Sequence, residues 1–566
     1  MATTFLAEIA GRAALKPQFT PYDGVSRQHD IYRLYTGARP QNTYWTDWGG
    51  WYDNQVSRSV EIRIVNWLFP ATSMADLLVM ENSCYSEDGY LYVHVPRHTW
   101  LYSESETTMA VMRIFLSGPK SAENAADMIL DGQYAGARFA VPSVTVKLSD
   151  VISGITLFGT FNITLDNQDG MFDGEGSVEL FNSPVKIQKA VAEYPEYEDF
   201  HKIREGLVES VKVDDKKFTV TVADKFRTLD GQVCRLVNAD DFPVAQDKYD
   251  TLGKPLPVVF GTVSVPLIEI AYTETEDGDN ITINAKYLAA EHISAFIGLY
   301  DENGTSLPYS LSGAVIFFQR TSSKDEKLKP EYARLAGYTA NRLGEIVTWL
   351  VAKKDSLQYV PSVWDVEETD RYITASPRLN LAVTGGDIKA AVQTALKSDM
   401  AYLIQKNDGR LTLRKWGEDY AVHEIPEWRI TAQPEKNFSD AEKHYFSSCV
   451  VRGKYNDFTK NYSESYVYND TEMTAVDKYL KNKLAEYETR LADTAGIKDI
   501  AASLAARFSV IKDTVRVSVG VDTSQFNLLD KARIKIIVNG RRYSNNETWV
   551  IKEINPAQDK LVMESL

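Results

Sequence analysis

Short segments in which apolar and polar residues alternate recur along most of this chain. Residues 144–148, 159–165 and 218–222 show this alternation, which is typical of strands that bury one face. Polar turns such as residues 214–217 separate neighbouring segments. Because 566 residues are too many for a single hydrophobic core, the pattern predicts a multidomain, mainly β protein of the α+β class.

Helices are predicted at only a few places in the middle of the chain. Residues 343–350 carry Leu and Ile on one helical face, and Asp387 is a good N-cap for a second helix. A hairpin over residues 401–414 follows this second helix. The combination predicts a mixed α/β region.

Three further helical segments are expected near the two ends. Residues 5–15 are interpreted as a short helix or arm that ends at Pro17. Apolar residues at helical spacing occur over residues 476–491 and again over residues 497–508. The chain then closes with strands, the last of which form a hairpin over residues 549–563.

A degenerate repeat links this last hairpin to an earlier one over residues 206–222. The match is one of pattern and turn length, not identity, so chance similarity between two hairpins stays open. If the repeat is real, it implies two similar β-barrels, and three such chains around an axis present six similar faces. A shift of 343 residues predicts the equivalences Val208 with Ile551, Val211 with Ile554, Phe218 with Leu561 and Val220 with Met563.

The order of these elements predicts five regions. Within the third, residues 280–284 and 314–318 alternate as strands do. The regions are an N-terminal arm and β domain (1–130), a first β-barrel (131–262), an inserted β module (263–329), a mixed α/β middle domain (330–440) and a second β-barrel with a helical insertion (441–566).

The charge balance argues against a nucleic-acid-binding protein. The net charge is −16, so the surface as a whole repels the phosphate backbone. No basic stripe that would hold DNA is evident in the sequence. An acidic surface is nevertheless compatible with DNA that passes nearby without adhering.

The three cysteines, Cys84, Cys234 and Cys449, lie far apart and form no CxxC pair. They are therefore predicted to be buried small apolar residues, not ligands of a zinc ribbon or parts of a disulfide framework. The first residues lack the basic start and apolar run of a signal peptide. No stretch approaches the roughly 18 apolar residues of a membrane helix, so we expect no membrane segment and folding in a cytoplasm.

Three short motifs resemble ligand sites but fit simpler structures better. His94 and His98 have the spacing of metal ligands on a helix, yet Pro96 lies between them in a predicted strand. Residues 166–173 place their Gly too early for a calcium loop and lack its closing Glu. Residues 384–387 lack the Lys of a phosphate loop. We expect neither a metal nor a cofactor.

Catalytic motifs are not evident either. The sequence has no GxSxG, and no set of Ser, His and Asp can be selected with a physical reason. With 78 acidic residues, the choice of any carboxylate pair would be arbitrary. The chain is therefore expected not to be an enzyme.

An unusual aromatic cluster lies near the N-terminus and consists of Tyr44, Trp45, Trp48, Trp51 and Tyr52. Aromatic rings are common anchors at protein interfaces and also fill small β cores. Beside an Asp, as here, exposed rings can also stack on sugars. The cluster is a candidate protein interface or glycan site.

Taken in order, several segments resemble the tail hub (baseplate hub or tail-tip) proteins of long-tailed bacteriophages and related contractile injection systems. Each motif alone is weak, and specificity comes from their order over roughly residues 137–566. The first 120 residues, the insertion at 270–318 and the helices at 470–508 are additions to the pattern. The segments that carry the resemblance are 161–172, 200–224, 253–261, 387–414, 450–455, 501–508 and 549–551.

The resemblance implies a structural protein of the virion tail that assembles in the host cytoplasm. As a homotrimeric ring it would close the tail tube, and its six barrels would join six-fold tail tube and distal tail proteins. Its lower domains would hold a three-fold tip or fibre protein. Viral DNA would pass through transiently without specific binding, and acidic groups lining the channel would keep it from adhering.

Two other functions stay open at the level of sequence. The aromatic stretch at 44–52 would suit a receptor- or glycan-binding module at the tail tip. A tail-associated cell-wall hydrolase is the third possibility, although no motif indicates it.

Overall fold

The structure is a computed structural model of the chain. Before residue 144 it describes only the backbone of thirteen strands, β1 to β13. The other described residues are 144–156, 160–166, 181–191, 200–214, 217–241, 251–323, 328–437, 445–469, 483–510, 512–538, 541–543 and 547–566. The early strands are β1 (Thr3–Arg12), β2 (Leu15–Pro17), β3 (His29–Tyr35), β4 (Tyr44–Trp45), β5 (Trp51–Tyr52), β6 (Val60–Ile64), β7 (Trp67–Ala71), β8 (Cys84–Glu87), β9 (Tyr90–Pro96), β10 (Trp100–Tyr102), β11 (Met109–Ser117), β12 (Ile129–Leu130) and β13 (Gln133–Tyr134).

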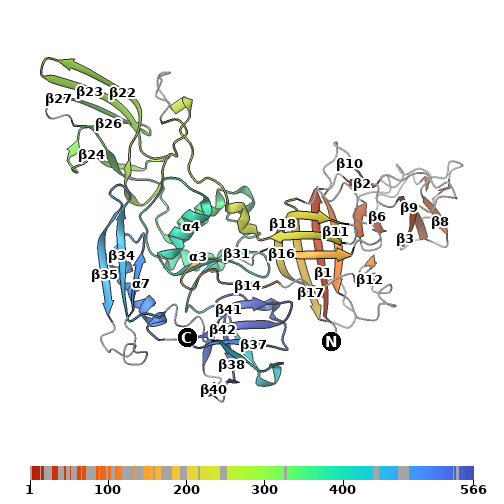
Figure 1. The fold of residues 1–566 in the computed structure, drawn as a ribbon. Helices are drawn as coiled ribbons and strands as arrows, with labels where there is room; N and C mark the ends of the chain where they lie inside the picture. The colour runs from red at the N-terminus through yellow and green to blue at the C-terminus, as the bar shows by residue number, and fades with distance from the viewer. Residues whose placement is uncertain are drawn as a thin grey trace.

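The described chain is mainly β and contains several separate sheets, as predicted (Figure 1). The predicted helix or arm at 5–15 is wrong, because this stretch lies mostly in β1, a ten-residue strand. Its apolar residues fit a helix or a strand equally well in isolation. Here β17 and β11 pair with its two edges, so backbone hydrogen bonds from distant segments decide the outcome.

A six-stranded sheet, which we call the first sheet, has the order β11-β1-β17-β18-β19-β16. Its buried face includes Ile163, Ile187, Val208 and Val220, each 0% exposed. Strands from both sides of residue 130 share this sheet. Its later strands are β16 (Phe161–Asp166), β17 (Pro184–Val191), β18 (His201–Val213) and β19 (Lys217–Ala223).

A second large sheet, which we call the second sheet, has the order β32-β38-β41-β42-β37-β33, with β14 also paired to β41. Its core contains Trp549, Ile551, Leu561 and Met563, all fully buried. The predicted closing hairpin is confirmed as β41 and β42. The strands are β14 (Val146–Lys147), β32 (Val422–Ile425), β33 (Glu435–Asn437), β37 (Thr514–Ser518), β38 (Lys531–Ile534), β41 (Thr548–Asn555) and β42 (Lys560–Ser565), with the β39–β40 hairpin (Ile536–Val538 and Arg541–Tyr543) beside them.

One continuous segment, residues 422–437, borders the second sheet at both of its edges. Its first part, β32, runs parallel to β38. After the short 3-10 helix η9 (Glu427–Arg429), the segment pairs antiparallel with β37 through the Ile430–Val519 bridge and then through β33. The two edge positions are therefore occupied by neighbouring parts of the same chain segment.

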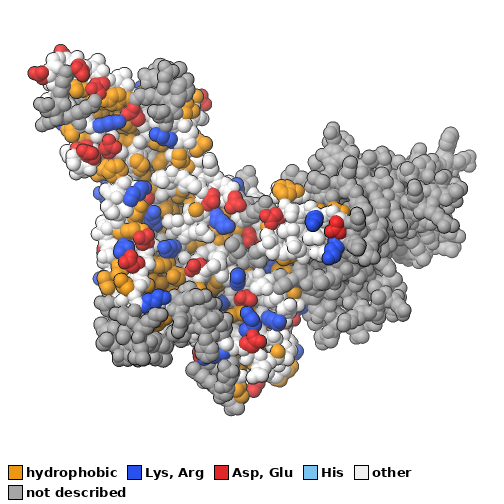
Figure 2. All heavy atoms as spheres, in the orientation of Figure 1, with side chains coloured by type: hydrophobic (Ala, Val, Ile, Leu, Met, Phe, Trp, Pro, Cys, Tyr) orange, Lys and Arg blue, Asp and Glu red, His pale blue; other side chains and the backbone are white. Residues whose placement is uncertain are grey.

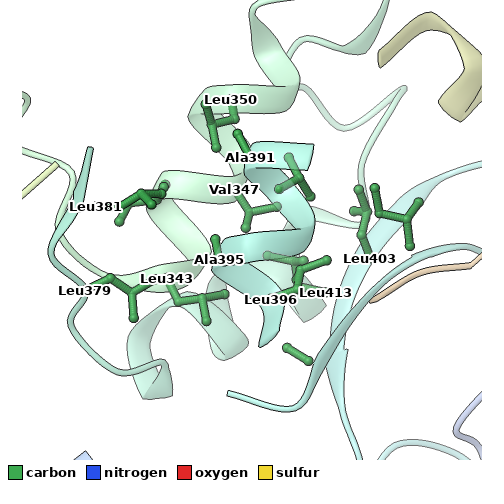
Figure 3. Packing of buried hydrophobic residues seen from close by; sticks show 14 of the residues in the cluster. Leu343, Val347, Leu350, Leu379, Leu381, Ala391, Ala395, Leu396, Leu403 and Leu413 are labelled. Carbon is green, nitrogen blue, oxygen red and sulfur yellow. The ribbon is translucent and has the colours of Figure 1, made fainter. Parts of the chain in front are cut away.

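A mixed α/β region around three helices contacts both large sheets through its hairpin. Figure 3 shows Leu343, Val347, Ala391, Ala395 and other buried apolar side chains packed between these helices and the neighbouring strands. The predicted helices and hairpin are confirmed, and the side chain of Asp387 caps its helix by accepting a hydrogen bond from the Ala390 backbone N–H. The elements are α2 (Leu343–Ala352), η8 (Asp355–Leu357), α3 (Val366–Ala375), α4 (Ile388–Lys397), β20 (Val258–Phe260), β29 (Leu381–Val383), β30 (Ala401–Gln405) and β31 (Leu411–Lys415).

Strand β30 buries both of its faces. Ala401 and Leu403 belong to the core around the helices, whereas Tyr402 and Ile404 belong to the core of the second sheet. This explains why the strand is a continuous run of apolar residues and does not alternate. On its outer edge β30 pairs in parallel with β15 (Gly154–Ile155).

Residues 262–336, a longer stretch than the predicted inserted module (263–329), contain two four-stranded sheets with the orders β21-β28-β24-β25 and β22-β23-β27-β26. The predicted strands at 280–284 and 314–318 are confirmed as parts of β23 and β27. The three long strands β22, β23 and β27 form an arm that extends away from the helices (Figure 1). The strands are β21 (Thr262–Pro266), β22 (Ile268–Asp277), β23 (Asn280–Leu288), β24 (Ala295–Tyr300), β25 (Ser306–Leu307), β26 (Ser310–Ser312), β27 (Val315–Ser323) and β28 (Tyr332–Ala336).

A three-stranded sheet in the order β35-β34-β36 lies near the C-terminal part of the chain. The helix predicted over 476–491 is wrong for its described part, because Leu484–Glu488 is the strand β36, which runs parallel to β34. Residues 476–482 lie outside the described residues. The second predicted helix is confirmed as α7. The bounds are β34 (Ser448–Asn456), β35 (Asn461–Asn469), β36 (Leu484–Glu488) and α7 (Thr494–Phe508).

Candidate functional site: two like sheets and the joint between them

The two large sheets contain the same four-strand unit. In chain order the units are β16, β17, β18 and β19 in the first sheet, and β37, β38, β41 and β42 in the second. In both, the second, third and fourth strands are neighbours and the first strand returns beside the fourth. All these pairings are antiparallel, which is a Greek-key arrangement.

A β-bulge at the same place makes the equivalence specific. In the first sheet the pairing of β18 with β19 shifts between Val208 and Ser210, and in the second sheet the pairing of β41 with β42 shifts between Ile551 and Glu553. These positions are 343 residues apart in both cases. Since a bulge bends a strand and re-aims its side chains, the two third strands are shaped alike. The predicted equivalences of Val208 and Val211 are confirmed.

The predicted equivalences on the fourth strand are wrong by two residues. Val211 pairs with Val220, whereas its counterpart Ile554 pairs with Leu561. Leu561 therefore corresponds to Val220, not to Phe218, and Met563 corresponds to Val222. The turn of the second hairpin is two residues shorter, which a constant shift along the sequence does not reveal.

The hairpin β30–β31 joins the middle region to the second sheet. The side-chain amide of Asn407, in the hairpin turn, donates hydrogen bonds to the backbone oxygens of Ser524 (2.7 Å) and Phe526 (2.6 Å). From β31, Arg414 Nη1 donates to the backbone oxygen of Leu528 at 2.7 Å and to Asp530 Oδ1 at 2.7 Å. The turn and the strand thus hold the residues that precede β38.

Arg414 is the centre of a buried ionic cluster. Its side chain is 3% exposed, that of Asp530 is 0% exposed and that of Glu368 is 11% exposed. Arg414 Nη2 donates to Glu368 Oε2 at 3.0 Å, and His423 Nε2 lies 2.9 Å from Asp530 Oδ2. Helix α3, strand β31, strand β32 and the residue directly before β38 therefore each contribute one member.

The charges in this cluster compensate one another. Burial raises the pKa of Asp530, but the hydrogen bond from His423 and the charge of Arg414 outweigh burial and leave it below its usual value. Burial likewise lowers the pKa of Arg414, while Glu368 and Asp530 raise it by more. Both groups are consequently held in their charged forms, and removal of one member would leave the others buried without compensation.

The same hairpin also contacts the first sheet. Gln405 Nε2 donates to the backbone oxygen of Glu205 in β18 at 3.0 Å. Gly409 has a φ of +86°, and a Cβ at this position would collide with the Glu205 carboxylate. Lys202 and Lys225 hold that carboxylate at 2.7 and 2.8 Å. Burial raises the pKa of Glu205, but the two lysines outweigh burial and lower it.

A third contact joins the two sheets directly. Lys189 in β17 is 1% exposed, and its Nζ donates to the Pro556 backbone oxygen at 3.1 Å and to Asp559 at 2.8 Å, in the turn between β41 and β42. Asp522 lies 3.3 Å from the same nitrogen. A buried ammonium thus fixes β17 to the β41–β42 turn.

This joint was not among the features predicted from the sequence. The signal for Lys189 was present, because Val185, Ile187 and Lys189 follow the alternation of inward-facing residues, and a Lys at such a position needs partners. Arg414 had no such signal, because it alternates with Leu411 and Leu413 and falls on the same strand face as Thr412. Neither pattern identifies the partners. Asp559 lies 370 residues from Lys189, and Asp530 lies 116 residues from Arg414.

A small cavity of about 170 Å³ lies beside the joint, next to α3 and the end of β31. Asp399 at its wall accepts hydrogen bonds from Tyr372 Oη at 2.8 Å and Lys415 Nζ at 2.7 Å, so both carboxylate oxygens have partners. In the part of the chain that the structure describes, no group of three His, Cys, Asp or Glu side chains is arranged to hold a metal ion. The geometry of this region is that of a structural joint.

The predicted aromatic cluster is described only in part. β4 and β5 pair with each other and bring Tyr44 opposite Tyr52 and Trp45 opposite Trp51. Trp48 lies outside the described residues, and the side chains of the other four are not described. The proposed interface or glycan role of the cluster therefore stays a prediction.

The other sequence candidates have simpler outcomes. Residues 384–387 lead into α4, as expected for a helix start. Cys234 and Cys449 are buried free cysteines, as predicted, and Cys84 lies in β8 without a described side chain. His94 lies in β9, while His98 and most of 166–173 fall outside the described residues.

Comparisons with known proteins give weak structural similarities and no sequence match. No protein-family model and no curated protein sequence matches the chain. A chain of the virion of a native gene transfer agent particle has a TM-score of 0.41 and 12% identity, covering 55% of this chain and 84% of that chain.

Two prophage proteins are also similar. The 43 kDa tail protein of prophage MuSo2 from Shewanella oneidensis has a TM-score of 0.36 and 10% identity, with 75% of this chain and 92% of that chain covered. The prophage tail protein gp18 from Listeria monocytogenes EGD-e has a TM-score of 0.24 and 10% identity, with 54% and 94% covered. All three TM-scores are too low to assign a shared fold. Among the described helices, none has the length and apolar character needed to cross a membrane.

Proposed function

We propose that this chain is a structural, non-enzymatic protein of a bacteriophage tail and that it forms a homotrimeric hub ring at the tail tip or baseplate. In this proposal the ring closes the tail tube and adapts a six-fold tail to a three-fold tip. The two Greek-key units are two hub-type β-barrels within the regions 131–262 and 441–566. The proposal follows the order of the sequence segments that resemble tail hub proteins.

The observation that carries the proposal is the duplicated four-strand unit with its matching bulge. Two like units in one chain, repeated by a three-fold axis, present six similar surfaces around that axis. A ring of this kind can meet a six-fold partner on one face and keep true three-fold symmetry on the other. A chain with a single unit would present only three such surfaces around the axis, which do not match a six-fold partner one to one.

The joint supports the proposal because a symmetry adaptor needs a fixed spacing between its two units. Three contacts fix it here: the Arg414 cluster, the Gln405–Glu205 hydrogen bond and the ion pair of Lys189 with Asp559. Charged groups that are buried and fully paired specify one arrangement, since any shift leaves a charge uncompensated. The two units would then move as one body.

The proposed partners follow from this geometry. The six barrels contact tail-tube and distal tail proteins, and the lower domains contact a tip or fibre protein. The net charge of −16 suits a channel that viral DNA passes during ejection without specific binding. The proposed location is the virion tail, after assembly in the host cytoplasm.

The mass of the purified full-length protein tests the proposal. Size-exclusion chromatography with light scattering is expected to give a particle of three times the 63.7 kDa chain mass. A stable monomer or dimer at micromolar concentration would contradict a self-assembling trimeric hub.

A further inference from the structure

The arm of the inserted module carries a regular array of short polar side chains on one face. Strand pairing aligns Thr275 with Thr282 and Thr282 with Thr321, so that these three form one row across the arm. The rows on either side contain Thr273, Asn284 and Gln319, and Asp277, Asn280 and Ser323. Because side chains two residues apart share a face of a sheet, all nine lie on the same side.

This polar arm face, as we name these nine residues, is open to solvent. Eight of the nine are exposed and Thr282, at its centre, is half-buried. Thr282 and Thr321 share a hydrogen bond of 2.9 Å, and Thr273 donates to the backbone oxygen of Asn284 at 3.3 Å. These contacts hold the side chains in place while their remaining donors and acceptors face outward.

The opposite side of the arm makes the polar arm face rigid. Ile281, Ile283 and Phe318 alternate with the polar residues, and each is at most 5% exposed within the core of the module. A strand whose alternate residues are anchored in a core presents the others at fixed spacing. The polar arm face is therefore a rigid surface.

Another solvent-facing sheet of this chain is built differently. On the β34–β36 pair, Arg452 forms ion pairs with Glu486 at 2.9 Å and with Glu488 at 3.7 Å. Charged residues are the usual means of keeping an exposed sheet soluble and free of other strands. The polar arm face has one charged residue among nine, Asp277, so solubility alone does not account for its composition.

The lower end of the same face offers an aromatic surface. The next row inward aligns Ala271, Lys286 and Phe317. Phe317 is half-buried, and Lys286 Nζ lies 5.2 Å from the centre of its ring. The ring gives an apolar contact beside the hydroxyl and amide groups, the combination with which binding sites fix a ligand that is partly polar and partly apolar.

We propose that the polar arm face binds a neutral polysaccharide. Neutral sugars present hydroxyl groups that both donate and accept hydrogen bonds, as the Thr, Ser, Asn and Gln side chains do. A linear sugar chain lying across the arm meets a side chain at each strand, about every 4.8 Å. Its apolar ring face packs on Phe317.

The charges around the polar arm face are mainly acidic, which disfavours anionic ligands. Glu276, Asp277 and Asp279 surround the turn at the tip of the arm and would repel phosphate, sulfate or uronic acid groups, whereas Lys286, beside Phe317, is the one cation in the four rows. Figure 2 shows this outer end of the module with white and red side chains. The arm points away from both large sheets (Figure 1), so a long polymer would reach it while the sheets are engaged in a ring.

The test is binding of the full-length protein to an array of immobilised neutral bacterial polysaccharides, with anionic polysaccharides on the same array. The protein is expected to bind at least one neutral polysaccharide and none of the anionic ones. The double variant Thr282→Ala with Asn284→Ala should bind about ten-fold more weakly, because hydrogen bonds from two side chains are lost.

The matched control is Asn461→Ala with Ser465→Ala, which removes the same two kinds of group from exposed positions of β35. Its binding should equal that of the unaltered protein. A second variant, Gln319→Ala, should also weaken binding and keeps the test valid if the double variant folds poorly. Failure of the unaltered protein to bind any neutral polysaccharide, preference for anionic ones, or equal loss in the control would overturn the proposal. Trimer formation is unaffected by either result.

Discussion

The first and second sheets share a four-strand unit. The strand that lies beside the second strand of this unit comes from a different part of the chain in each sheet. In the second sheet β32, part of the segment 422–437, lies parallel to β38. In the first sheet β1, from the beginning of the chain, lies antiparallel to β17. The unit is therefore compatible with a neighbouring strand that runs either parallel or antiparallel to its second strand. Both copies keep the four-strand order and the bulged hairpin, so these two features define the unit.

Deletion of the bulge residue should have the same effect in both sheets. Removal of Glu209 or of Lys552 leaves the pairs on either side of the bulge in place and makes the ladder regular, so the strand loses the bend and the extra twist of the bulge. We expect each deletion to cost about 1–3 kcal/mol in the free energy of unfolding. Thermal unfolding followed by circular dichroism measures this. A tolerated deletion in one sheet would break the equivalence of the two units.

Replacement of Arg414 by Met should be the most damaging single substitution in the joint. It removes the cation that Asp530 and Glu368 share and leaves Glu368 only the more distant Lys406 Nζ at 3.6 Å, which costs about 3–5 kcal/mol. Arg410, four residues earlier, is 39% exposed and pairs mainly with Asp408, so Arg410→Met is the matched control and should cost less than about 1 kcal/mol. Chemical denaturation compares them. Equal effects would contradict a central role of the Arg414 cluster.

Replacement of Lys189 by Met tests the direct contact between the sheets. Asp559 and Asp522 are 28% and 23% exposed, so water replaces part of the lost interaction. The expected cost is about 1–2 kcal/mol. Lys186 in the same strand is exposed, and Lys186→Met should change stability by less than about 0.5 kcal/mol. Limited proteolysis should show faster cleavage between the sheets only in the Lys189 variant.

Mild acid should weaken the two halves of the joint at different pH. The folded-state pKa values of Glu205 and Asp530 both lie below their ordinary values of 4.5 and 3.8. Each group therefore contributes stability that is present above its ordinary pKa and is lost as the pH falls toward its folded value.

The ion pairs of the Glu205 carboxylate with Lys202 and Lys225, beside the hairpin turn, should begin to weaken below pH 4.5, and the Asp530 cluster only below pH 3.8. At pH 4 and above, this loss of stability is smaller than the losses expected from the bulge deletions, from Arg414→Met and from Lys189→Met. The unfolding midpoint measured from pH 3 to pH 6 tests it, with Glu205→Gln expected to remove the earlier decline. An earlier decline that persists in this variant would assign it to other groups.

The sequence predicted the strands and the repeat better than it predicted what surrounds them. Alternation identified β18, β19, β41 and β42 because one buried face imposes a period of two. The same reasoning failed at β1 and β36, where short apolar runs fit both helix and strand. Their partners, β17 and β34, lie far away in the sequence, and pairing with them settled the conformation.

The joint was beyond prediction for a related reason. Lys189 could be recognised as a charged residue at an inward position, whereas Arg414 could not, because it lies on the polar face of its strand with Thr412. The partners of both depend on the arrangement of three separate regions. The shorter turn of the second hairpin likewise left no mark in the apolar pattern, since a change of two residues preserves the alternation. Distant contacts and turn length are set by tertiary structure.

The most direct test of the central claim is the rotational symmetry of the purified full-length protein in electron-microscope class averages. We expect a closed ring with three-fold symmetry in which six similar densities, one for each four-strand unit, surround an axial channel. Rings with another number of subunits, or three-fold particles in which the two units lie at clearly different radii, would contradict it.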